Sequence, residues 1–101
     1  MICALTVRKL KPGTFDRFHE AFVAPMREGQ APRGLVRFNM VRSTEDPDLV
    51  VTFGVFDGTP EQLREWAAEF GYAEQQAAIA PFVESVGADG FFDIIEERVA
   101  G

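Results

Sequence analysis

The sequence has few of the side chains that bind metal ions. It contains one cysteine and one histidine among 101 residues. The single cysteine, Cys3, excludes an intrachain disulfide, and we expect it to be a small buried apolar side chain within a strand. A metal site needs at least roughly three converging ligands, and carboxylates such as Asp93, Glu96 and Glu97 are expected to be solvated. We therefore expect no metal site.

The chain also lacks the motifs that bind nucleotides and flavins. It has neither a GxGxxG sequence nor a P-loop. A lone histidine gives no legible Ser-His-Asp set, because it would support many accidental pairings. Any oxygen chemistry would therefore have to proceed without a tightly bound redox cofactor, and we expect no cofactor.

Basic residues are scarce, especially in the second half. The net charge is −6, and residues 57–101 hold two basic and ten acidic side chains. This balance argues against nucleic acid as a partner, since a binder needs a basic face. No apolar run approaches the roughly 20 residues that span a bilayer, which argues against a membrane partner. Residues 1–7 lack the features of a signal peptide, so we expect a cytoplasmic protein.

Apolar residues are abundant for so short a chain. They make up 47% of the sequence and include ten phenylalanines. We expect one domain over residues 1–101, which would bury roughly two-thirds of the surface of its unfolded chain. Either the core is unusually aromatic, or some apolar surface meets a partner or a ligand.

The pattern predicts the order strand, helix, strand, strand, helix, strand. Thr14 and Thr59 are expected helix caps, and Thr59 begins a capping box completed by Gln62. Pro25 should kink or end the first helix, and Gly71 should break the second. The expected strands and helices are 2–8, a helix from residue 15, 35–42, 49–56, a helix from 60 that resumes over 72–80, and 90–99.

The third expected strand carries no charge on either face. It comprises residues 49–56, and the last strand begins with Phe91 and Phe92. With both helices on one face of the sheet, the other face should alternate with polar residues if it were open to water. We therefore expect a second copy of the same sheet to cover it, giving a homodimer. The alternative is a far face that is apolar without being covered.

This arrangement resembles the antibiotic biosynthesis monooxygenase type of the dimeric α+β barrel superfamily. The likeness covers essentially the whole chain, and order and spacing carry it more than any single motif. It is carried by Lys11-Pro12-Gly13, Arg33-Gly34-Leu35, Ser43 to Asp48, and Thr59-Pro60-Glu61-Gln62-Leu63 with Trp66. The resemblance implies an α+β, ferredoxin-like βαββαβ fold with a four-stranded antiparallel sheet that pairs into a dimeric barrel.

Family members include oxygenases that act on polycyclic phenols without metal or flavin. In these, an Asn, a Trp and a Tyr on the second helical segment face the cavity, and Gln62, Trp66 and Tyr72 are similar here, with Gln in place of Asn. An arginine that such enzymes use further along has no counterpart, since nothing basic lies between Arg64 and Arg98.

A haem-degrading branch of the family resembles this chain at Trp66. That branch expects an axial histidine further along, where this sequence has Gln75 and Gln76. Glutamine is a poor iron ligand, so haem degradation is not expected.

Each candidate on the second helical segment has a structural alternative. Trp66 either lines a pocket or anchors the helix to the sheet. Gln62 either contacts a substrate or serves only the capping box. The Tyr72 hydroxyl either bonds a phenolic oxygen and relays a proton, or sits half-buried at the helix bend.

Three further candidates lie elsewhere. His19 falls on the apolar stripe of the first helix, where it is either a general base or a satisfied core histidine. Asn39 and Arg37 share one face of the second strand. They orient a substrate oxygen if that face looks toward the helices, and lie in the dimer interface if it does not.

The function that fits is a cofactor-independent monooxygenase. It would oxidise an aromatic phenol or hydroquinone in a dry pocket between helices and sheet, with catalytic Tyr72, Trp66 and His19 and with Gln62, Asn39 and Arg37 binding substrate. The alternatives are a homodimer that binds a small aromatic ligand without catalysis, and a structural homodimer with a filled interior.

Overall fold

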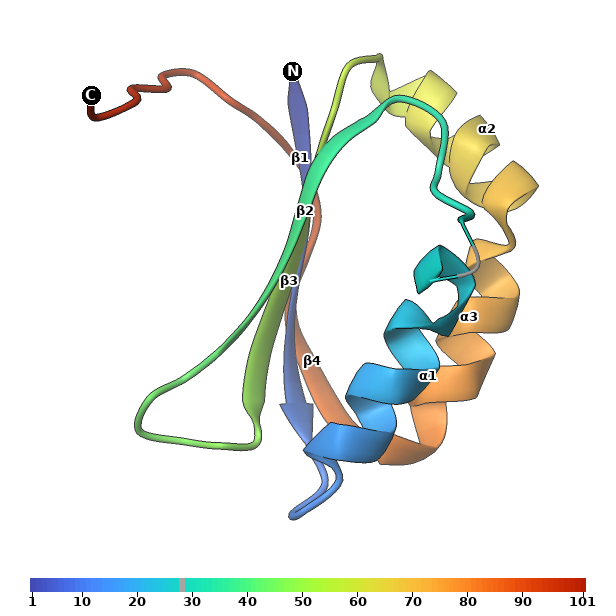
Figure 1. The fold of residues 1–101 in the computed structure, drawn as a ribbon, viewed down its shortest axis with the longest axis vertical. Helices are drawn as coiled ribbons and strands as arrows, with labels where there is room; N and C mark the ends of the chain where they lie inside the picture. The colour runs from blue at the N-terminus through green and yellow to red at the C-terminus, as the bar shows by residue number, and fades with distance from the viewer. Residues whose placement is uncertain (28) are drawn as a thin grey trace.

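The computed structural model describes residues 1–27 and 29–101 as an antiparallel sheet with helices on one face (Figure 1). The strands are β1 (Ile2–Leu10), β2 (Leu35–Arg42), β3 (Leu49–Phe56) and β4 (Val83–Asp93). The helices are α1 (Phe15–Arg27), α2 (Pro60–Phe70) and α3 (Tyr72–Ile79), with a 3-10 turn at Ala80–Phe82. The strand order is β2-β3-β1-β4. The predicted α+β, ferredoxin-like βαββαβ arrangement is confirmed.

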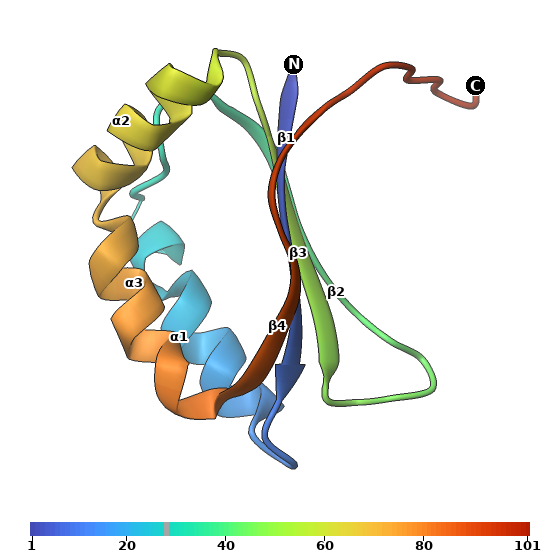
Figure 2. The same ribbon diagram turned by 180° about the vertical axis from the view of Figure 1, so that it is seen from behind.

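Local sequence signals explain where the second helical segment begins and bends. At the start of α2, the Thr59 hydroxyl accepts from the Gln62 backbone N–H (3.2 Å) and the Gln62 side chain accepts from the Thr59 N–H (2.9 Å). Gly71 ends α2 in the left-handed region, with φ of 92°, which glycine adopts without steric cost. The chain turns there and continues at once as α3. Seen from behind, α2 and α3 curve over the sheet (Figure 2).

The last strand differs from the prediction of residues 90–99. It begins at Val83 and ends at Asp93, because it follows the whole length of β1, from Leu10 opposite Val83 to Ile2 opposite Asp93. β1 itself continues to Leu10, two residues beyond the predicted end. Pairing between the strands therefore sets the lengths of β1 and β4. Apolar alternation did not predict the first half of β4, because that half is largely polar.

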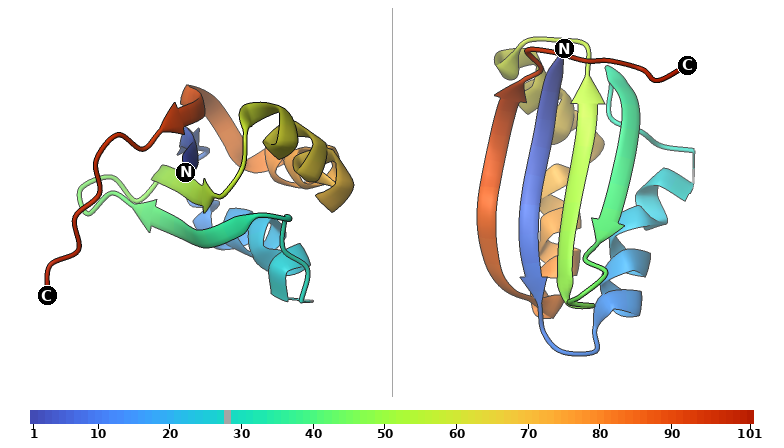
Figure 3. Two further views of the ribbon diagram at one scale, coloured as in Figure 1. Left: turned by 90° about the horizontal axis from the view of Figure 1, so that it is seen from above. Right: turned by 90° about the vertical axis from the view of Figure 1, so that its left-hand side faces the viewer.

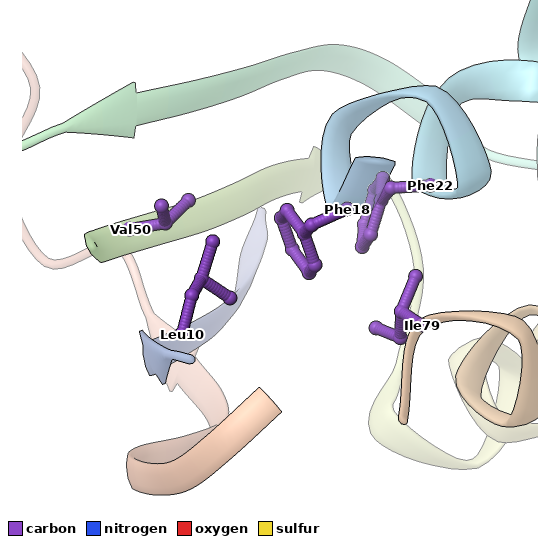
Figure 4. Close-up of a cluster of buried hydrophobic side chains, with 5 residues drawn as sticks. All are labelled: Leu10, Phe18, Phe22, Val50 and Ile79. Atoms are coloured by element: carbon purple, nitrogen blue, oxygen red, sulfur yellow. The ribbon is translucent and has the colours of Figure 1, made fainter. Parts of the chain in front are cut away.

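The apolar core lies where α1 and α3 meet the sheet. Its members come from four elements, and Leu10 and Val50 on the strands face the side chains of α1 and α3 (Figure 4). Phe18 and Phe22 are one helical turn apart in α1 and so present their rings to the same side. The five members of the core are Leu10, Phe18, Phe22, Val50 and Ile79.

All the helices are short. The longest, α1, has 13 residues and buries Phe18 and Phe22, while Glu20 and Arg27 pair on its exposed side. Within the described part of the chain, no helix has both the length and the apolar character needed to cross a membrane.

No helix of the described residues covers the opposite face of the sheet (Figure 3, right). Apolar side chains such as Val41 and Phe92 are exposed there. Strand register separates the two faces, because directly opposed residues point to the same side. Thr6 opposes Thr52 on the helix side, whereas Val7 opposes Val51 on the open side. The segment after β4 crosses one end of the open face. There Arg37 of β2 pairs with Glu97 at 2.7 Å.

Candidate functional site

A cavity of about 510 Å3 lies between the sheet and the second helical segment. Its wall is mainly apolar, and small residues leave the space open, including Ala4 and Gly54 on the sheet and Ala67 and Ala73 on the helices. This volume is in the range of small-molecule sites, roughly 300 to 1,000 Å3. Larger apolar side chains on the wall include Phe22, Phe38, Leu63, Phe70 and Phe91.

Arg8 forms a polar spot in this apolar wall. It sits at an inward position of β1 and is only 3% exposed. Its Nη1 donates to the Thr52 hydroxyl (2.8 Å) and its Nη2 donates to the Gln76 side-chain oxygen (3.3 Å). Its guanidinium carbon lies 5.9 and 5.5 Å from the ring centroids of Phe18 and Phe22. Such distances are within the range of cation–π attraction.

Burial lowers the pKa of Arg8 from its ordinary value, while the charges of Tyr72 and Asp89 act to raise it. An arginine keeps its proton in proteins at neutral pH in spite of such a change. In the described residues, no carboxylate comes within the 4.0 Å of a salt bridge to Arg8. The Asp89 carboxylate instead accepts from the Thr6 hydroxyl at 2.9 Å.

Tyr72, the first residue of α3, also lines the cavity. Burial raises the pKa of its phenol, the charge of Asp89 raises it further, and the charge of Arg8 opposes both. The hydroxyl therefore stays protonated at neutral pH and can donate a hydrogen bond. Because the chain bends at Gly71, Tyr72 starts a new helix at the edge of the cavity and remains 42% exposed.

Two glutamines of α3 have different roles. Gln75 is 7% exposed, and its amide donates to the Phe22 carbonyl (2.7 Å), which ties α3 to α1. Gln76 accepts from Arg8. Arginine can only donate, so the Gln76 oxygen must face it and the amide nitrogen must point elsewhere. That nitrogen is buried without a partner among the described residues.

Trp66 and Gln62 lie outside the lining of this cavity. Trp66 packs on Gly34 and Gly58, so closely that a Cβ at Gly34 would lie 2.3 Å from its ring. It also borders a smaller cavity of about 260 Å3 that includes Arg33. Gln62 is exposed and occupied by the capping box. In the structure, Trp66 anchors α2 to the turns at the ends of the strands.

The other three predicted residues also lie away from the cavity lining. Asn39 opposes Phe53 and Arg37 opposes Val55, so both are on the open face of the sheet. His19 is half-buried and its ring stacks on Phe15, with the centroids 5.6 Å apart. Of the six residues predicted from the sequence, the structure brings only Tyr72 to the cavity.

Sequence reasoning missed Arg8, Gln76 and Asp89. A signal for Arg8 was available, because alternation along β1 puts it on the same side as Thr6 and the buried Leu10. Asp89 was missed because the predicted last strand began at residue 90. Gln76 was considered only as a replacement for a histidine.

The model of the antibiotic biosynthesis monooxygenase family matches residues 1–68, and the chain belongs to this family. The chain has the α+β fold that its resemblance to this family implied. No curated protein matches the chain in sequence.

Solved structures from several organisms share the fold. SnoaB, a cofactor-independent oxygenase from Streptomyces nogalater, is 16% identical with a TM-score of 0.77, over 95% of this chain and 94% of that one. A Nitrosomonas europaea protein of the antibiotic biosynthesis monooxygenase type is also 16% identical, with a TM-score of 0.78 over 95% and 100% of the two chains. A conserved protein from Methanosarcina mazei Go1 is 11% identical, with a TM-score of 0.76 over 90% and 89%. At these identities the likeness establishes the fold.

Replacing Gly34 by alanine tests the anchoring role of Trp66. Gly34 has φ of +81° and touches Trp66, whereas Gly13 has φ of +74° and no atom within 4 Å of a Cβ. Gly13→Ala should cost about 1 kcal/mol for the backbone alone. Gly34→Ala should cost about 1 to 3 kcal/mol more, because Trp66 must move. Urea unfolding followed by Trp66 fluorescence measures both, and equal losses would contradict the anchoring role.

A pH titration tests the environment of Tyr72. It is the only tyrosine, so phenolate absorbance reports this residue alone. In the folded protein we expect a pKa above the ordinary value of 10.0, because burial and Asp89 disfavour the phenolate. This group's contribution to stability is complete below the unfolded pKa and is lost as pH rises through the folded pKa. The same titration in urea is the control, and identical midpoints would refute the prediction.

Proposed function

We propose that this protein is a cofactor-independent monooxygenase that oxidises an aromatic phenol or hydroquinone between the helices and the sheet. The cavity carries the proposal, because it combines apolar walls with one polar cluster around Arg8 and Tyr72. Membership of the antibiotic biosynthesis monooxygenase family supports it. So does the fold shared with SnoaB, which is itself a cofactor-independent oxygenase.

The chemistry needs a substrate that can supply electrons to oxygen itself. Loss of the phenolic proton gives an anion whose ring carbon, still bearing hydrogen, bonds to one atom of O2. The resulting hydroperoxide breaks its O–O bond and loses water, leaving a carbonyl on that carbon. One oxygen atom stays in the quinone product and the other leaves as water, together with two hydrogens that come from the substrate.

The protein would contribute orientation, a water-poor cavity and donors to the substrate oxygen. Tyr72 is the donor that we retain from the sequence prediction, because the residue lines the cavity and its phenol stays protonated at neutral pH. Flat aromatic rings fit the space beside Ala67 and Ala73, where short side chains leave the wall open. Trp66 would then act on the reaction only through the position of α2.

We further propose that two copies pair through their open sheet faces. This face includes Val7, Val51 and Phe53 on the two central strands, and Val41 and Phe92 on the outer strands are 43% and 47% exposed. Unless another layer covers it, an apolar sheet face of this extent leaves apolar side chains in contact with water, which is unfavourable. An identical face provides a complementary cover through a two-fold axis.

Oxygen consumption tests the enzymatic proposal. With a hydroxylated naphthalene or anthracene substrate, we expect O2 uptake without added metal or flavin. Tyr72→Phe should lower turnover by at least about tenfold, because it removes one donor to the developing oxyanion. Glu65→Gln, on the exposed side of α2, is the matched control and should be unaffected. Thermal stabilisation by such compounds without uptake would instead identify a binding protein.

Sedimentation tests the pairing. The wild type should sediment at twice the chain mass of 11.2 kDa at micromolar concentration. Phe53→Lys puts a charge in the centre of the open face and should give the single chain, whereas Glu65→Lys on α2 should leave the dimer intact. A wild-type protein found only at 11.2 kDa would exclude this proposal.

A further inference from the structure

The cavity contains a buried positive charge that no carboxylate of residues 1–27 and 29–101 contacts. Arg8 is 3% exposed, and its hydrogen bonds in the structure go to two neutral groups, Thr52 and Gln76. A buried charge is costly unless it is paired, and an arginine of a small domain is rarely so enclosed. A cation kept at this cost in a cavity wall suggests that a negative partner arrives from outside the chain.

The groups that hold Arg8 keep its charge in place without cancelling it. Hydroxyl and amide oxygens offer partial negative charge only, and the faces of Phe18 and Phe22 attract the cation without neutralising it. A guanidinium has five N–H donors. Thr52 and Gln76 each take one donor, which leaves the fork able to bind a further oxygen atom.

The other charged groups on the cavity wall do not change the sign of its charge. They are Arg64, which lies 5.4 Å over the Phe91 ring, and Asp89, which is exposed and bonded to Thr6. Among the described residues, two arginines and one aspartate line the cavity, and their charges sum to +1. The whole chain carries −6. The cavity is therefore positive inside an acidic protein.

We propose that Arg8 is the anion-binding residue of this cavity and that the natural ligand is an aromatic acid bound as its conjugate base. The charged oxygen of the ligand would lie at Arg8, and its rings would extend along the apolar wall toward Phe91. The ligand chemistry is an oxyanion conjugated with an aromatic ring, as in a phenolate, an enolate of a hydroxyquinone, or an aryl carboxylate. Guanidinium binds such planar oxyanions strongly, through charge-assisted hydrogen bonds.

This inference rests on the proposed function and narrows its substrate class. The anion is the form of a phenol that reacts with oxygen, so a site that binds the anion more tightly than the neutral phenol also lowers the pKa of the bound substrate. Arg8 would then favour proton loss without itself taking the proton. The proton leaves to solvent at the exposed edge of the cavity, beside Tyr72.

Three ring systems of similar size test the charge preference directly. The first is 2-hydroxy-1,4-naphthoquinone, which is an enolate at neutral pH. The second is 2-naphthoate, which is a carboxylate, and the third is 1,4-naphthoquinone, which is uncharged. Calorimetric titration of the wild type should show at least one anion binding about tenfold or more tightly than the neutral quinone, as expected for a charge-assisted hydrogen bond. Equal affinities for all three would overturn the proposal without the need for any variant.

Variants of Arg8 assign the preference to this side chain. Arg8→Met keeps the apolar stem and should weaken anion binding by about tenfold or more, with little change for the neutral quinone. Arg8→Lys keeps the charge and should retain part of the preference. Arg64→Met, at the exposed arginine of the same wall, is the matched control and should have the smaller effect. An anion preference that survives in Arg8→Met would contradict the role of Arg8.

Failure of this inference can be told from failure of the enzymatic proposal. Anion-selective binding without oxygen uptake would reject the monooxygenase and support Arg8. Oxygen uptake with no preference for anions would support the monooxygenase and reject the role of Arg8. Circular dichroism and urea unfolding of each variant show whether it is folded. Should Arg8→Met not fold, the partial preference of Arg8→Lys and the wild-type comparison still decide the question.

Discussion

The packing of this small domain depends on one enclosed cation. Arg8 extends from β1 beneath Phe18 and Phe22 of α1, bonds Thr52 on β3 and reaches Gln76 on α3. This side chain of β1 therefore contacts three other elements, α1, β3 and α3. Removing a partner of such a group leaves a buried charge less well satisfied, so the positions of α1 and α3 over the sheet are coupled through it.

The interior is closely packed on one side of Arg8 and hollow on the other. Toward the end of β1, Leu10, Val50 and Ile79 pack closely with the α1 rings and exclude solvent. Toward the other end, small residues and the bend at Gly71 leave the α2 side of the cavity unfilled. The close-packed end holds the helices in register, which lets the opposite end remain hollow at little cost to the fold. Such a division is a common way for a domain to keep a ligand site rigid.

The fold was predictable because its signals are local and repeated, whereas the site depends on contacts between elements. The capping box at Thr59 and the break at Gly71 were readable from a few neighbouring residues. The start of β4 was not, because pairing with β1 rather than apolar alternation sets it. The sequence left open whether Trp66 lines a pocket or anchors the helix, because its contacts at Gly34 and Gly58 are with turns outside its own helix. A charged residue in a strand is ordinarily expected to face water, so Arg8 was not predicted to line the cavity.

The charges on the protein surface and the charge inside the cavity act on a ligand with different strength. The acidic side chains of α2 and α3, including Glu61, Glu65 and Glu74, are exposed, and salt screens them over about 8 Å at physiological ionic strength. Arg8 is removed from water, where charge interactions are far less screened. An anion is therefore repelled only weakly on approach and attracted strongly once inside. Selectivity for an anion can thus be local to the cavity, even though the protein as a whole carries a charge of −6.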